Sequence, residues 1–102
     1  MNDQQLLALA AKAADDGIVF YGECWRAQSG REWNPLLDDG DALRLAVKLE
    51  MQVCIGIQRI DATLVGYEDG QVFRGTEAKD GDICTATRQA IVRAAAAIGK
   101  EM

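Results

Sequence analysis

The sequence contains no histidine and only three cysteines. Without histidine the chain lacks the commonest general base and the commonest neutral metal ligand, which excludes most familiar hydrolase and metal-site arrangements. Cys24, Cys54 and Cys84 lie too far apart for the paired short spacing of zinc ligands, and none has a neighbouring base that would activate it. We therefore expect free thiols in structural roles, with Cys54 and Cys84 buried, and neither catalytic residues nor a bound metal.

Long apolar runs and basic tracts are absent as well. No stretch approaches the roughly 20 apolar residues that span a bilayer, and the first residues lack the basic region of a secretory signal. We therefore expect a cytoplasmic protein that does not associate with membranes. Asp and Glu outnumber Lys and Arg by 16 to 11, which gives a formal net charge of −5 and argues against nucleic-acid binding. The ten glycines form no phosphate-binding pattern, so we expect no nucleotide cofactor.

The remaining composition is that of one ordinary globular domain covering residues 1–102. Apolar residues make up 49% of the chain and charged residues 26%, and a chain of this length has room for a single core. Three segments show the 3.6-residue spacing of an amphipathic helix. Their expected ranges are 3–14, 41–50 and 83–98. Asp82 or Thr85 would cap the last helix, and Gly99 would be a natural stop.

Four further segments have the β-branched or alternating character of strands. Their expected ranges are 18–21, 51–58, 62–67 and 71–74. We expect a bend at 59–61 and a tight hairpin turn at Glu68-Asp69-Gly70, because Asp-Gly between extended runs favours such a turn. Residues 22–39 are predicted to form a structured loop that can include a hairpin, and residues 76–82 a second loop.

This order of elements predicts an α+β fold in which helices flank an antiparallel sheet. If helices cover both faces of the sheet, the result is a three-layer α/β/α sandwich, which is the arrangement we expect. If they cover one face only, the bare face becomes a candidate for self-association.

The most suggestive polar cluster is Asp38-Asp39-Gly40-Asp41. Closely spaced carboxylates around a glycine can bind calcium or magnesium, but the late bidentate glutamate of a calcium loop is missing. We favour the interpretation that these acids cap a helix and complement its positive end. Trp25 and Trp33 could add an interaction surface, because tryptophan is enriched at binding hot spots. The candidate interaction surface therefore comprises Trp25, Trp33, Asp38, Asp39 and Asp41.

Two segments resemble short proteins encoded by bacteriophages and prophages. They are Trp33-Asn34-Pro35-Leu36-Leu37-Asp38-Asp39-Gly40-Asp41-Ala42-Leu43-Arg44-Leu45-Ala46 and Ala86-Thr87-Arg88-Gln89-Ala90-Ile91-Val92-Arg93-Ala94-Ala95. The chain is similar in these segments to the phage ABA sandwich domain family, whose aromatic-Asn-Pro segment precedes a helix. The resemblance implies a helix-sheet-helix sandwich from a mobile element without assigned activity, in which Asn34, Pro35, Asp41 and Arg93 are structural anchors.

These observations favour a non-enzymatic phage or prophage accessory protein in the cytoplasm of a bacterial host. It would act by binding an unknown protein partner or by self-association as a homo-oligomer. One alternative is a small metal-dependent module that uses the acids from Asp38 to Asp41. Another alternative is an acidic decoy that occupies a DNA-binding protein in place of nucleic acid.

Overall fold

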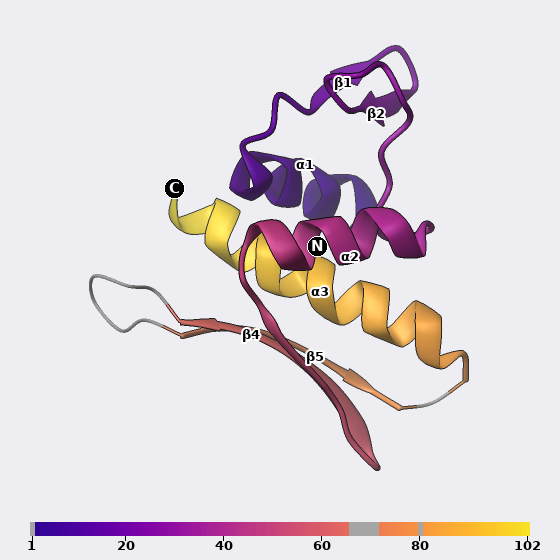
Figure 1. Ribbon diagram of the computed structural model, residues 1–102, viewed down its shortest axis with the longest axis vertical. Coiled ribbons are helices and arrows are strands. Elements are labelled where there is room, and N and C mark those ends of the chain that lie inside the picture. The colour runs from indigo at the N-terminus through magenta and orange to yellow at the C-terminus, as the bar shows by residue number, and fades with distance from the viewer. Residues whose placement is uncertain (1, 66–71, 80) are drawn as a thin grey trace.

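The computed structural model describes residues 2–65, 72–79 and 81–102 and has an α+β fold, which confirms the predicted class (Figure 1). Its elements are α1 (Asp3–Ala14), β1 (Val19–Tyr21), β2 (Cys24–Arg26), α2 (Asp39–Lys48), β3 (Gln52–Ile55), β4 (Arg59–Val65), β5 (Val72–Ala78) and α3 (Ile83–Glu101). None of the helices in these ranges is both long and apolar enough to cross a membrane.

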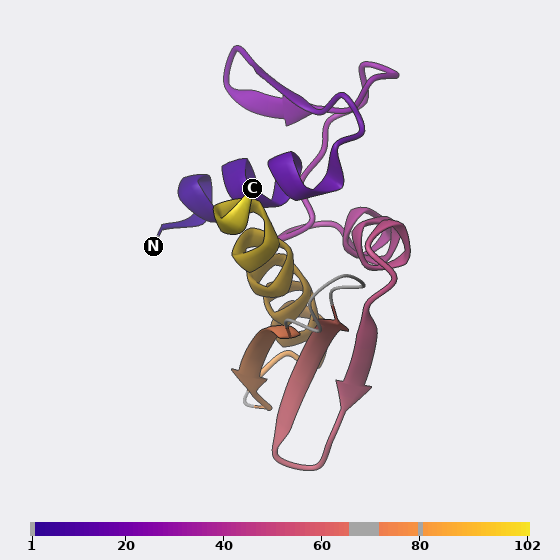
Figure 2. The ribbon, with the colours of Figure 1, turned by 90° about the vertical axis from the view of Figure 1, so that its left-hand side faces the viewer.

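The main sheet is antiparallel, with the strand order β3-β4-β5. Figures 1 and 2 show all three helices on one side of this sheet, so it has one bare face and the expected three-layer sandwich does not form. The reason lies in the alternation along β4. Ile60 and Ala62 point toward the helices and are completely buried, whereas Asp61 and Thr63 point the other way and are partly exposed. Only one face is apolar enough to need a covering layer.

Helix α3 is the centre of the fold, because it packs on β4 and β5 with one side and on α1 with another. The contacts are made at the level of the main chain. A Cβ atom built on Gly75 of β5 would lie 1.9 Å from the carbonyl oxygen of Ala90, and one built on Gly99 would lie 2.0 Å from that of Leu9. The alanines of α3 allow this close approach, since Ala90, Ala94 and their neighbours fill the interior with small side chains.

Each helix begins at a side chain that accepts a hydrogen bond from the first turn. Asn2 caps α1 in a capping box with Gln5. Asp38 caps α2, which starts two residues earlier than predicted. Asp82, one of the two predicted candidates, caps α3.

Three predicted boundaries in the second half of the chain are wrong. The expected bend at 59–61 lies inside β4, because the chain already turns after Gly56, whose N–H donates to the carbonyl of Arg59 at 2.9 Å. The expected loop at 76–82 begins late, since β5 continues to Ala78. Gly99 does not end α3. It lies inside this helix, where the absence of a Cβ allows the backbone of α1 to approach closely. The predicted turn at Glu68-Asp69-Gly70 lies outside the described residues.

The loop predicted at 22–39 begins with a strand. β2 pairs with β1 as a small hairpin, and Phe20 and Trp25 contact edge to face across it, with ring centroids 5.3 Å apart. The expected burial of Cys54 and Cys84 is wrong, because both are exposed, and Cys24 is partly buried. Cys54 lies on the bare face of the sheet, directly opposite Asp61.

Candidate functional site

The segment that leads into α2 is fixed by hydrogen bonds of its own backbone. The side-chain oxygen of Asn34 accepts from the N–H of Leu36 at 3.0 Å, and its carbonyl accepts from the N–H groups of Leu37 and Asp38. Pro35 is fully buried beside this turn. Asn34 and Pro35 therefore place Asp38 where its carboxylate can cap the helix, accepting from the N–H of Asp41 at 2.8 Å.

Asp41 is the one buried charged residue of the described chain, with 2% of its side chain exposed. Its carboxylate accepts hydrogen bonds from the guanidinium groups of Arg31 and Arg44, each at 2.8 Å, and from the N–H of Asn34 at 2.9 Å. Burial on its own would raise the pKa of Asp41, but the bonds from Arg44, Asn34 and Arg31 together outweigh it and lower the pKa below its ordinary value. Asp41 is therefore ionised, and its carboxylate stabilises the fold through these three hydrogen bonds.

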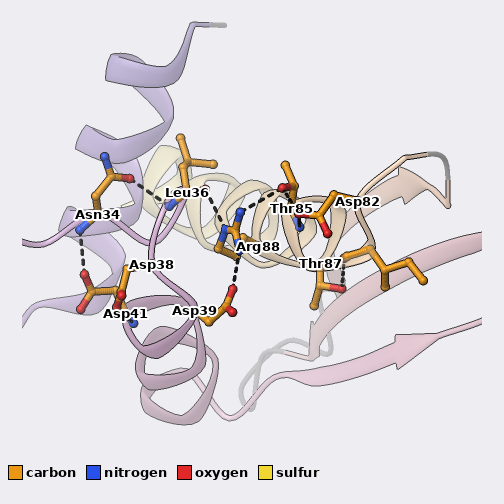
Figure 3. A network of polar contacts seen from close by, with 10 residues as sticks. Asn34, Leu36, Asp38, Asp39, Asp41, Asp82, Thr85, Thr87 and Arg88 are labelled. Atoms are coloured by element: carbon orange, nitrogen blue, oxygen red, sulfur yellow. Dashed lines mark hydrogen bonds and ion pairs between the residues drawn. The ribbon is translucent and has the colours of Figure 1, made fainter.

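Arg88 connects α3 to the same segment (Figure 3). Its Nε donates to the carbonyl of Leu36 at 2.9 Å, one terminal nitrogen pairs with Asp39, and the other donates to the hydroxyl of Thr85 at 2.9 Å. Only 14% of the Arg88 side chain is exposed. The guanidinium thus ties α3 to Leu36 and Asp39 at the start of α2, while Thr85 of its own helix holds it in place.

Two of the five residues predicted as an interaction surface, Trp33 and Asp41, are buried, whereas Asp38 and Asp39 are exposed. Trp33 is 5% exposed and belongs to the core, and Trp25 packs partly buried against the same core with its Nε1 near Gln4. Asp41 is buried as well. The bulky side chains of Trp25 and Trp33 stabilise the fold, because they fill the space between the β1–β2 hairpin and the helices.

The carboxylates of Asp38, Asp39 and Asp41 all interact with other groups of the protein. Asp38 caps α2, Asp39 pairs with Arg88, and Asp41 is neutralised by two arginines. Within the described ranges there is no group of three His, Cys, Asp or Glu side chains placed to hold a metal ion. The capping interpretation is confirmed for Asp38, which also lies 3.7 Å from the Arg44 guanidinium that Asp41 binds, whereas Asp39 pairs with Arg88 instead.

A different feature stands out as the candidate site, an apolar groove that encloses about 280 Å³ between α2, β3 and the first half of α3. We call it the α2–β3 groove. Its lining consists of Asp39, Ala42, Leu43, Ala46, Val53, Ile55, Ile83, Cys84, Thr87, Arg88 and Ile91. Leu43 and Ile55 are 64% and 55% exposed, and Val53 and Ile83 are exposed too. Large apolar side chains grouped at one site in this way are typical of a contact surface.

One wall of the groove is an edge strand. β3 pairs with β4 on one side only, and Figure 2 shows it at the margin of the sheet, with α2 near its beginning. Because the N–H of Gly56 points toward β4, alternation makes the backbone groups of Val53 and Ile55 point outward. No element among the described residues pairs with them. The groove therefore combines apolar side chains with unpaired strand backbone.

Sequence reasoning missed this groove because it assigned the same residues to the core. The 3.6-residue spacing at 41–50 predicts a helix with one apolar stripe, yet Leu43 and Val47 on that stripe are exposed and only Ala42, Leu45 and Ala46 among the apolar residues of α2 are buried. The available signal was the width of that stripe. Apolar side chains occupy more of the circumference of α2 than a single packing face needs.

Comparison of the chain with protein-family models, with curated proteins and with solved structures found no match. The resemblance to the phage ABA sandwich family thus stays a prediction. The functional argument rests on the geometry of the groove.

Proposed function

We propose that this chain is a non-enzymatic accessory protein that acts by binding a protein chain in the α2–β3 groove. The exposed apolar lining carries this proposal. Leu43 is more than half exposed although α2 buries its other face in the core, and Ile55 is more than half exposed on β3, where every residue is exposed. Such grouping is unfavourable in water and is relieved when a partner covers it. A phage or prophage origin would fit a small binding protein of this kind.

The chemistry of the groove supports binding rather than catalysis. Its ionisable pair, Asp39 and Arg88, is engaged in the tie between α2 and α3, and Cys84 has no base beside it among the lining residues. The acidic decoy and the metal-dependent module both need carboxylates that can act outward. Asp38, Asp39 and Asp41 each bind a protein group, so their placement favours the protein-binding function over the metal-dependent module.

Capture from the lysate of a bacterial host tests this function with a matched pair of variants. Leu43→Asp places a charge in the groove, whereas Leu37→Asp places the same charge at an exposed leucine that does not line it. We expect the wild-type chain and Leu37→Asp to retain the same protein, either a second copy or a different chain, and Leu43→Asp to lose it. Capture that is indifferent to Leu43→Asp would refute the proposal.

A further inference from the structure

We propose that the chain covering the α2–β3 groove is a second copy of this protein, joined through β3 to form one continuous six-stranded sheet. This inference rests on the proposed function and names its partner. The two copies would be related by a two-fold axis perpendicular to the sheet. This axis would pass midway between Cys54 of one copy and Cys54 of the other.

The first argument is the composition of the edge. From Met51 to Gln58 the chain carries no charge and no proline, whereas β5 at the opposite edge carries Arg74 and Glu77. Natural edge strands that stay unpaired are normally protected by charges, prolines or bulges. β3 has no such protection, and its neutrality lets a second chain with the same net charge of −5 approach without close like-charge contacts.

The second argument is the register that the backbone permits. Antiparallel pairing centred on Cys54 places Val53 of each copy beside Ile55 of the other, so that both pairs exchange hydrogen bonds through their outward groups. Pairing centred on Val53 would instead require the N–H of Met51, which already donates to the carbonyl of Ala46 at 2.9 Å. The available groups therefore favour the Cys54 register over the Val53 register, and they match the length of the same short edge on a second copy.

The third argument is the size of the contact. Leu43, Val53, Ile55 and Ile83 of the groove, with Val47 one turn along α2, are between 37% and 67% exposed. Their exposed area is roughly 450 Å² per copy, more than half of the ~800 Å² that each partner contributes to a standard interface. The edge backbone of β3 and the polar rim supply the remainder. The two-fold axis puts both grooves on the same side of the joined sheet, where their apolar linings adjoin.

Light scattering on the purified full-length chain tests the proposal through two matched substitutions. Ile55→Lys alters the proposed contact, and Val72→Lys alters a residue of similar exposure, 53% against 55%, on the far edge strand. We expect the wild-type chain and Val72→Lys to have twice the monomer mass of 11.1 kDa. Ile55→Lys should raise the dissociation constant of the dimer roughly a hundredfold, because the symmetric interface loses the side chain twice. Circular dichroism would verify that both variants fold.

A cysteine cross-link tests the register independently. Directly opposed residues of a non-hydrogen-bonded antiparallel pair have Cα atoms ~4.5 Å apart, which is within the range of a disulfide. A variant that retains only Cys54 should therefore form a covalent dimer with diamide as oxidant, much faster than a variant that retains only the exposed Cys84.

A wild-type chain that is monomeric at near-millimolar concentration would overturn the proposal, as would a dimer indifferent to Ile55→Lys or equal cross-linking through the two cysteines. The proposed function would survive those results if a different protein were still captured from the lysate through Leu43. Loss of both the dimer and the capture would refute the two together.

Discussion

Gly75 of β5 lies directly against the main chain of Ala90 in α3, so that the sheet and its covering helix meet without an intervening side chain. This contact is possible because Gly75 has no Cβ and Ala90 has only a methyl group. The distance between the layers is therefore set by two backbones rather than by side chains that could repack.

Replacing Gly75 with alanine should lower the free energy of unfolding by about 3 kcal/mol, since the added methyl group collides with the α3 backbone at Ala90 and Ala94. Chemical denaturation measures the change. Gly22→Ala is the control. Gly22 also lacks a Cβ, but an added one would meet no atom within 4 Å, and the positive φ of 72° should cost only about 1 kcal/mol. Equal losses in the two variants would contradict the close approach.

Asp41→Asn should remove about 3 kcal/mol of stability, because Arg31 and Arg44 lose the ionised carboxylate they share. Asp16→Asn is the matched control, since the ion pair of Asp16 with Lys48 is about half exposed on both sides and should contribute less than about 1 kcal/mol. Urea denaturation of the three proteins at neutral pH checks the difference. A loss for Asp41→Asn as small as that of the control would mean that the buried pair does not stabilise the fold.

The same carboxylate makes stability depend on acidity. The folded protein holds the pKa of Asp41 below its ordinary value of 3.8, so the unfolded chain takes up a proton first as the pH falls. The stabilisation is complete above that ordinary value and is lost as the pH falls through the lowered pKa. Between about pH 5 and about pH 2 the wild-type chain should therefore lose more stability than Asp41→Asn. Superimposable pH profiles would exclude this linkage.

Arg88→Lys should destabilise the protein by about 2 kcal/mol, because a lysine ammonium cannot reproduce the planar fork that reaches Leu36, Asp39 and Thr85 together. Arg93→Lys serves as the comparison. Its side chain is 55% exposed and pairs with Glu77 alone, so the change should be below about 1 kcal/mol. Thermal unfolding of both variants would reveal the ranking, and a reversed order would contradict the role of Arg88 as a tie.

Much of the fold could be predicted from local pattern. The three helices and the α+β class follow from apolar spacing, and the cap at Asp82 follows from its side-chain chemistry. The turn between β3 and β4 was misplaced because the alternation continues through Ile57, which is 92% exposed. Ile60, by contrast, was assigned to a bend although it is completely buried. Period alone does not distinguish an apolar residue in a turn from one in a strand.

Less of the candidate site could be predicted from the local sequence pattern. The helix-capping role of the acids near Asp38 could be predicted, because it depends on neighbours in sequence. The pairing of Asp41 with Arg31 could not be predicted, because it depends on how the loop before α2 folds against that helix. The exposure of Leu43 could not be predicted either, because it depends on how α2 is placed beside α3. Helix α3 covers β4 and β5 so closely that β3 is left at the margin, and the groove is the space that remains.

Leu9 meets Gly99 across almost the whole length of the chain, and α1 makes its main packing contacts with α3. During synthesis, α1 therefore leaves the ribosome long before the helix that buries its apolar face exists. Nearly every other element must be translated first. The nascent polypeptide would expose Leu7 and the alanines beside it to water throughout that interval.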